Sequence, residues 1–350
     1  MVYFDSDYMT GAHPEVLDRL VETNSLHTPG YGTDIFCRKA KELILKECEL
    51  EEGEVFFLEG GTQTNATVID RLLSRNDGVI AADTSHINVH EAGAIEAWGH
   101  KVIVLPAIDG KLTASQINDY IVTFYQDDTY LHMVRPAMVY ISFPTELGTI
   151  YSRPELESIY GVCRKFDIPL YIDGARMAYG LATSDDLSLK EIARLCDVFY
   201  IGGTKCGSLF GEAVVARNKD LLPRFFSLMK LHGALLAKGR LLGVQFEALF
   251  SNGLYGRIGR HGVALAEKLK KGFLKKGYST FIDSPTNQQF FLLPNEVIDV
   301  LREKVSFELW GARGVDETPV RFVCSWSTRE EDVDTVLNNL PYANKKPALT

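Results

Sequence analysis

Between Glu54 and Ala216 the sequence alternates short apolar runs with longer amphipathic stretches, and this rhythm restricts the possible folds more than any other feature. Helix-like stretches such as TNATVIDRLLSR and RPELESIYGVCRKF lie between several of the apolar runs. The alternation predicts an α/β fold whose central sheet is mostly parallel and carries helices on both faces. The apolar runs have the length and the Val, Ile, Tyr and Phe content of strands: EVFFLE, GVIAAD, KVIVLP, AMVYIS, IPLYID, DVFYIG and EAVVA.

The alternation of strand-like and helix-like segments changes after Leu242. A long helical stretch is followed by ALAEKLKKGFLKKG, by the strand-like QFFLLP, by another helix through Val300 and by VRFVCSW. This pattern is typical of a smaller α/β domain with its own short sheet. We therefore expect a large domain over residues 1–245, which includes the N-terminal segment, and a small C-terminal domain over residues 246–350.

Composition excludes several classes of protein. A formal net charge of -9 without any stripe of lysine and arginine argues against nucleic-acid binding. No segment approaches the roughly 20 apolar residues that a membrane span requires, and the N-terminus lacks the pattern of a secretory signal. The six cysteines show no paired spacing, which predicts neither a metal site nor a disulfide framework. We expect a cytoplasmic protein without a bound metal.

Chemically suggestive residues follow four of the predicted strands. In a parallel sheet the carboxyl ends of the strands meet at one edge, where ligands bind, so these residues are expected to share one crevice. They are Gly60, Gly61 and Thr62 after EVFFLE, His86 after GVIAAD, Asp173 at the end of IPLYID, and Thr204 and Lys205 after DVFYIG.

Asp173 and Lys205 together match the needs of pyridoxal 5'-phosphate (PLP). This cofactor requires an anion beside its ring nitrogen, which keeps the ring electron-withdrawing, and a lysine that binds its aldehyde as a Schiff base. Each residue alone can also be explained without a cofactor, because an aspartate often caps a helix and most lysines are exposed. Their placement at two strand ends of one sheet favours the cofactor.

Two further motifs fit the same cofactor. EGGTQTN, residues 59–65, presents backbone N–H groups at a helix start, which suits a single phosphate, although a tight turn without a ligand looks similar. The glycine fingerprint GxGxxG is absent, which argues against a nicotinamide oxidoreductase. His86 is placed to lie over the cofactor ring and to exchange protons, and His90 is its less favoured neighbour.

With these motifs in order, the chain resembles the threonine aldolase and β-eliminating lyase family of fold-type-I PLP enzymes, which have the aspartate-aminotransferase-like fold. The pieces that carry the resemblance are SDYMTGAHPEVL, YGTD, GGT, SHI with a later E-x-G, IDGAR, the loop that carries Lys205, and VRFVCSW. The resemblance implies that Lys205 carries PLP, that Asp173 pairs with its ring nitrogen and that His86 stacks on its ring. It also implies that Gly60, Gly61, Thr62, Arg176 and Thr204 contact the cofactor and that Ser6, Arg176 and Arg321 bind the substrate carboxylate.

Two segments depart from the family pattern, and the first is the lysine loop, which reads TKCG where Ser-Lys-Gly is more usual. Where many threonine aldolases have Asn-Thr-His-Asn, this chain reads ISFPTELGT, with Phe143 and Pro144 in place of Thr and His. In the family that histidine lies near the substrate hydroxyl. Its replacement leaves His86 or a bound water molecule as the expected base.

The resulting hypothesis is retro-aldol cleavage of a β-hydroxy-α-amino acid into glycine and an aldehyde. β-Elimination from cysteine or an aromatic amino acid and racemisation use the same residues and stay open, and a non-catalytic binding module is a remote alternative. By resemblance we expect a homodimer or homotetramer. The candidates for reaching a neighbouring subunit are His27, Tyr31, Lys238 and Arg240.

Overall fold

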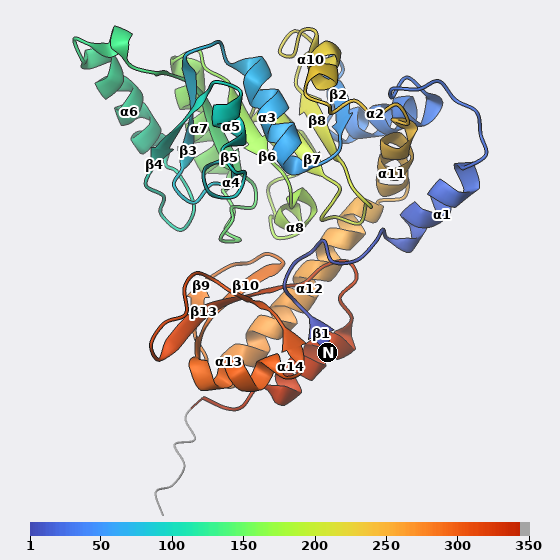
Figure 1. Cartoon of the computed structure of the whole chain (residues 1–350), viewed down its shortest axis with the longest axis vertical. Coiled ribbons are helices and arrows are strands. Elements are labelled where there is room, and N and C mark those ends of the chain that lie inside the picture. Colours follow the sequence, from blue (N-terminus) through green and yellow to red (C-terminus); the bar gives the residue numbers. More distant parts are fainter. Residues whose placement is uncertain (344–350) are drawn as a thin grey trace, which may run out of the picture.

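A computed structural model describes residues 1–343, so residues 344–350 of the expected C-terminal domain lie outside the described residues. Its larger part is built on a seven-stranded sheet in which only β8 runs against its neighbours (Figure 1). Each apolar run of the sequence forms one of these strands, which confirms the predicted mostly parallel sheet. In sheet order they are β2 (Glu54–Leu58), β8 (Glu212–Ala216), β7 (Val198–Gly202), β6 (Leu170–Asp173), β5 (Arg135–Ser142), β3 (Asp77–Ala82) and β4 (Lys101–Leu105).

Helices cover both faces of this sheet because successive strand residues point to opposite sides. In β5, Val139 and Ile141 belong to one apolar cluster, whereas Met138 and Tyr140 belong to the other. The first face is covered by α2 (Ile35–Glu47), α6 (Ala114–Gln126), α7 (Arg153–Lys165), α8 (Met177–Leu181), α9 (Leu189–Arg194) and α11 (Arg240–Ser251). The second face is covered by α3 (Gly61–Leu72), α4 (His86–Val89), α5 (Ala94–Ala97) and α10 (Phe225–Leu231).

Local sequence signals set the start of the connecting helices. Thr113 and Gln116 form a capping box at the first turn of α6, and Ser152 and Glu155 form one at α7. In each box a side chain accepts a hydrogen bond from a backbone N–H that has no partner within the helix. These caps fix the points at which the chain turns back toward the next strand.

The smaller part is an antiparallel sheet packed against helices. Its strand order is β12 (Glu308–Leu309), β13 (Glu317–Val323), β10 (Gln288–Pro294) and β9 (Thr280–Ile282), and its helices are α13 (Asn295–Arg302) and α14 (Glu330–Asn339). The long helix α12 (Leu254–Lys275) packs against α8 of the larger part and against α14 and β10 of the smaller part. It is therefore the element that connects the two (Figure 1).

The N-terminal strand lies with the smaller part, not with the large sheet. β1 (Val2–Tyr3) pairs in parallel with β11 (Val305–Ser306), and Phe4 belongs to the same apolar cluster as Phe322. The boundary expected at residue 245 falls inside α11, which packs against α1 (Pro14–Thr23) and α2. The packing thus favours a boundary after Ser251, with residues 1–4 joined to the C-terminal part.

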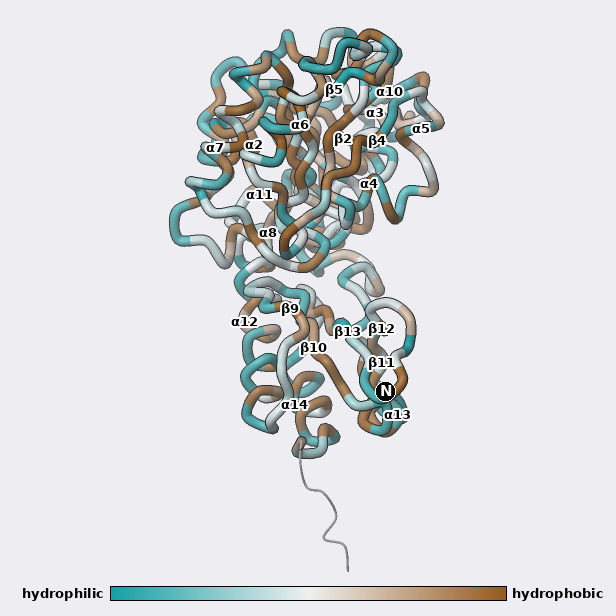
Figure 2. Tube along the Cα trace, turned by 90° about the vertical axis from the view of Figure 1, so that its left-hand side faces the viewer, coloured by the Kyte–Doolittle hydropathy of each residue, from teal (hydrophilic) through white to brown (hydrophobic). Residues whose placement is uncertain are grey.

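Apolar residues follow the strands through the interior of the larger part, while hydrophilic stretches gather in its outer loops (Figure 2). The six cysteines are buried and unpaired. Among residues 1–343 no helix combines the length and the hydropathy that crossing a bilayer requires.

Candidate active site

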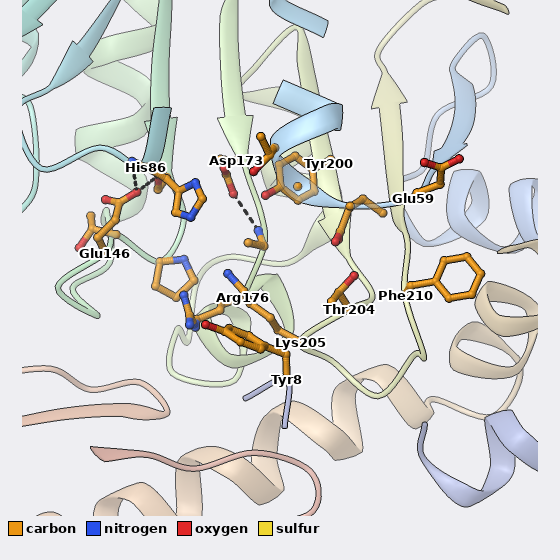
Figure 3. A pocket seen from close by; sticks show the side chains of 18 residues that line it. Tyr8, Glu59, His86, Glu146, Asp173, Arg176, Tyr200, Thr204, Lys205 and Phe210 are labelled. Carbon is orange, nitrogen blue, oxygen red and sulfur yellow. Dashed lines mark hydrogen bonds between the residues drawn. The ribbon is translucent and has the colours of Figure 1, made fainter. Parts of the chain in front are cut away.

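A cavity of about 310 Å³ lies at the carboxyl-end edge of the large sheet, where β5, β6 and β7 end and α3 begins (Figure 3). All eight residues that the sequence assigned to the cofactor line it. They are Gly60, Gly61, Thr62, His86, Asp173, Arg176, Thr204 and Lys205.

Asp173 is a buried anion that neutral groups hold in place. Its Oδ2 accepts hydrogen bonds from Tyr140 Oη at 2.6 Å and from Asn65 Nδ2 at 3.0 Å. Its Oδ1 accepts one from the backbone N–H of Ala175 at 3.0 Å. Burial acts to raise the pKa of this carboxyl, but hydrogen bonds from Tyr140, Tyr200 and Asn65 together with the charge of His86 outweigh it, so the pKa lies below its usual value. The carboxylate stays charged without bonding to a lysine or arginine among residues 1–343.

A chain of hydrogen bonds links Asp173 to His86. Asn65 accepts from Tyr171 Oη at 2.9 Å and donates to both Asp173 and Glu91, the latter at 2.7 Å. Glu91 in turn lies 2.7 Å from His86 Nδ1. Burial raises the pKa of the Glu91 carboxyl. The network fixes the orientation of the His86 ring and leaves Nε2 as its nitrogen without a partner in the described part of the chain.

A tight loop between β7 and β8 carries Lys205. The backbone N–H groups of Gly203 and Thr204 both donate to the carbonyl oxygen of Gly211, at 3.0 and 3.1 Å. A Cβ atom at Gly203 would lie 2.6 Å from that oxygen, so only glycine fits there. Burial and the charge of Arg176 lower the pKa of the Lys205 amine. The loop thus holds in the cavity an amine that loses its proton more readily than an exposed lysine does.

The start of α3 forms an anion-binding corner of the cavity. Gly60 is the N-cap residue in extended conformation and offers no side chain to the first helical turn. The N–H groups of Gly61 and Thr62 therefore have no partner within the helix. The positive end of the 12-residue helix faces the same place, which suits a phosphate group.

Arg176 is paired within the protein. Its Nε and Nη2 donate to the two carboxylate oxygens of Asp7, at 2.7 and 3.0 Å, and the Asp7 side chain is fully buried. Nη1 has no hydrogen-bond partner among the described residues and is the guanidinium nitrogen left for a ligand. Arg176 still lines the cavity, although two of its three guanidinium nitrogens already donate to Asp7.

Arg321 lies on β13 of the smaller part and does not line this first cavity. It lines an adjoining cavity of about 310 Å³ that it shares with His86, Arg176 and Lys205. Nη1 donates to Gln288 at 3.0 Å, Nη2 pairs with the Glu308 carboxylate, and the buried Nε has no partner in the described part of the chain. Burial lowers the pKa of this guanidinium. Because buried donors are usually hydrogen-bonded, the unpaired Nε–H of Arg321 indicates that this side chain can donate to a further acceptor, such as a bound ligand.

Ser6 stands apart from the other predicted residues. It is partly buried between β1 and α1, and it lines neither of the two cavities. Its neighbours Asp7 and Tyr8 take part instead: Asp7 pairs with Arg176, and the ring centre of Tyr8 lies 5.9 Å from Lys205 Nζ. The expected contact of Ser6 with a substrate has no support in this geometry.

The sequence analysis missed two residues that line the cavity, Glu212 and Glu146, and two that hold Asp173, Asn65 and Tyr140. Glu212 on β8 is 3% exposed, accepts the Gly203 N–H at 3.0 Å, and has a pKa raised by burial to about 8. A glutamate within the otherwise apolar run EAVVA was the signal that could have revealed it. Asn65 and Glu146 lay inside quoted motifs, whereas nothing distinguished Tyr140 from an ordinary core residue of its strand.

The four candidates for intersubunit contact lie away from this site. His27, Lys238 and Arg240 line one surface hollow, and Tyr31 lines another. Arg240 donates to the carbonyl oxygens of Leu26 and Thr23, so it ties the N-terminal loop to α11.

Comparisons with known proteins agree on the family and the fold. A family model described as beta-eliminating lyase matches residues 4–292. A low-specificity L-threonine aldolase of Pseudomonas aeruginosa is 31% identical over 343 residues, 94% of each chain. The solved structure of a Leishmania major threonine aldolase has 39% identity and a TM-score of 0.93, and covers 97% of this chain and 98% of that one. An aspartate aminotransferase of Thermus thermophilus, 14% identical with a TM-score of 0.69 over 97% of this chain and 90% of its own, shares the fold. The predicted aspartate-aminotransferase-like fold is confirmed.

Proposed function

Because this chain belongs to the beta-eliminating lyase family, we propose that it is a PLP-dependent lyase that cleaves a β-hydroxy-α-amino acid into glycine and an aldehyde. The observation that carries the proposal is the meeting of Lys205, Asp173 and the start of α3 on one cavity. The threonine aldolases of Pseudomonas and Leishmania, which align over nearly the whole chain, support the aldol reaction in particular.

The residues fit the cofactor. PLP, when bound, supplies a ring that draws the electrons of a broken bond away from Cα of the substrate. The Gly61 and Thr62 N–H groups match its phosphate, and the buried anion of Asp173 matches a protonated ring nitrogen. Lys205 has the lowered pKa that covalent attachment to an aldehyde requires. Since Asp173 bonds only to neutral donors, its charge is available to a cationic partner.

The remaining residues position the substrate. Arg321 and Arg176, which line the adjoining cavity together, bind the α-carboxylate. By fixing the carboxylate and the amino group, these residues would orient the substituents of Cα and so select the bond that breaks. His86 lies over the cavity as a flat ring that Glu91 holds, which closes one face of the cofactor to water.

A steady-state screen of β-hydroxy amino acids tests the proposal directly. Threonine, allo-threonine and phenylserine are offered to the purified protein, and glycine and aldehyde are quantified. We expect both products in equal amounts. Pyruvate and ammonia from cysteine or tyrosine, without aldehyde from any β-hydroxy substrate, would replace the aldol assignment with β-elimination.

The protein is further proposed to act in the cytoplasm as a homodimer or homotetramer. Six buried cysteines without a disulfide support a reducing compartment. Exposed apolar side chains on the N-terminal segment and on α10, namely Leu17, Val21, Tyr31, Phe226 and Leu231, support a subunit interface there. Light scattering of the purified protein measures the number of subunits.

A further inference from the structure

The loop that follows β5 places a carboxyl group on the wall of both cavities. Glu146 lies four residues beyond Ser142, the last residue of β5, and is shared by the cofactor cavity and by the adjoining cavity that Arg321 lines. Phe143 and Pro144, which precede it, carry no group that exchanges protons. Any acid–base chemistry contributed by this loop therefore depends on Glu146.

Two donors hold the Glu146 carboxyl through a single oxygen. Oε1 accepts the backbone N–H of His86 at 2.9 Å and the hydroxyl of Ser142 at 2.7 Å (Figure 3). Oε2 has no hydrogen-bond partner among residues 1–343. The arrangement orients the carboxyl beside the His86 ring and keeps one oxygen available to a ligand in the cavity.

The other carboxyl groups near the substrate are already engaged. Both oxygens of Asp173 accept hydrogen bonds, and Glu308 is paired with Arg321. Glu91 holds His86 with Oε1, and its Oε2 is buried away from the cavity surface. Glu212 accepts the N–H of Gly203 beside the lysine loop, and both Glu212 and Glu59 line only the cofactor cavity.

We propose that Glu146 is the catalytic base that takes the β-hydroxyl proton of the substrate. This inference rests on the proposed function. As Oε2 accepts the proton, the O–H electrons form the aldehyde C=O bond, and the Cα–Cβ bond breaks with its electron pair left at Cα. A proton delivered to Cα then completes glycine, so that one proton has moved from oxygen to carbon and no oxidant is needed.

The electrostatic surroundings suit this task. Burial raises the pKa of Glu146 above its usual value, and the charge of Asp173 acts in the same direction, while hydrogen bonds from Ser142 and from the His86 N–H oppose them. A base of raised pKa is a stronger proton acceptor near neutral pH. The ionisable groups that face it are His86, Glu91, His90, Tyr140, Tyr151, Asp173, Arg176, Lys205, Tyr8, Glu308 and Arg321.

The test compares Glu146→Gln with the wild-type holoenzyme. Glutamine keeps an oxygen that accepts both hydrogen bonds but removes the base. We expect kcat for aldol cleavage to fall by roughly 10²- to 10⁴-fold, the usual contribution of a positioned base. Glycine lacks the β-hydroxyl, so its dissociation constant, measured from the change in cofactor absorbance, and its α-hydrogen exchange in D₂O are expected to stay unchanged.

A matched control is Glu191→Gln. Glu191 also accepts a backbone N–H and a serine hydroxyl, both from Ser188 at the start of α9, but lies outside both cavities. This variant is expected to cleave at the wild-type rate. In the pH profile of kcat/KM, wild-type activity falls as pH decreases through the raised pKa of Glu146, because the protonated carboxyl accepts no proton. The Glu146→Gln variant is expected to lose this acid limb.

Three results would overturn the proposal. The first is a Glu146→Gln variant that cleaves at the wild-type rate or keeps the acid limb. The second is loss of glycine binding and exchange together with cleavage, since that pattern indicates a structural role. The third is a wild-type enzyme that binds glycine but releases no aldehyde, which is the failure of the proposed function itself.

Discussion

The two ends of the cavity hold their charges in different ways. At the end proposed for the cofactor ring, called the ring end below, Asp173 is an anion that accepts hydrogen bonds from neutral donors of the large sheet and its helices. At the end proposed for the substrate carboxylate, called the carboxylate end below, Arg176 and Arg321 are cations. They are already paired with the acidic side chains of Asp7 and Glu308. A buried charge solvated by neutral groups keeps its attraction for an incoming counter-ion, whereas a paired one has to share it.

This difference indicates which kind of ligand each end of the cavity suits. The ring end is suited to a permanent cationic partner, because Asp173 forms no ion pair with a lysine or arginine among residues 1–343. The carboxylate end is suited to a ligand that binds and dissociates, because the pairing of Glu308 with Arg321 gives a ligand carboxylate a competitor to displace. Asp7 is fully buried and holds Arg176 in place, but Glu308 is 41% exposed and leaves more easily.

The strongest way to break this comparison is Asp173→Asn, which removes the ring-end anion and keeps the side-chain size. We expect kcat/KM to fall by roughly 10³-fold, or about 4 kcal/mol, because the ring nitrogen is no longer held protonated. Steady-state kinetics measures the loss. Tyr140→Phe is the control, since it removes one neutral donor and leaves the charge. An equal loss in both variants would show that the donors, not the anion, matter.

Arg321→Lys tests the carboxylate end. Lysine keeps the positive charge but loses the planar fork, so we expect KM to rise by roughly 10- to 100-fold, given that a charge-assisted hydrogen bond contributes about 1.5–3 kcal/mol. The change in kcat is expected to be smaller. Separate determination of kcat and KM distinguishes substrate binding from chemistry. A fall in kcat at constant KM would remove Arg321 from the binding of the carboxylate.

Glu308→Gln sharpens the contrast between a permanent and a displaceable partner. Removing the carboxylate that competes for Arg321 is expected to lower KM by roughly two- to fivefold, because an ion pair whose carboxylate is exposed contributes about 0.2–1 kcal/mol. Thermal unfolding is expected to change little for the same reason. A rise in KM would mean that Glu308 binds the substrate and does not compete with it.

The sequence predicted the ring end better than the carboxylate end. Lys205, Asp173 and Gly61 follow strands of one parallel sheet, and a parallel sheet brings the ends of its strands to one edge. That geometric rule needs no knowledge of side-chain packing. It is the reason why residues far apart in the chain could be assigned to one cavity.

The carboxylate end depends on contacts that no local pattern encodes. Arg321 reaches the cavity because the smaller part packs under the large sheet, and Arg176 is held by Asp7 of an irregular N-terminal segment. The placement of β1 beside β11 joins residues about 300 positions apart and has no periodic signal. Ser6 of the same N-terminal segment was expected at the site, but its neighbours Asp7 and Tyr8 are the residues that contact Arg176 and approach Lys205.

The most direct test of the central claim is to locate the covalent attachment of the cofactor. The purified protein is treated with borohydride, which fixes an imine-bound cofactor as a stable amine, and is then digested and analysed by mass spectrometry. We predict that the pyridoxyl phosphate mass appears on the peptide that contains Lys205 and is absent after Lys205→Ala. A modification on another lysine, or a Lys205→Ala protein that keeps the cofactor absorbance and full activity, would contradict the account.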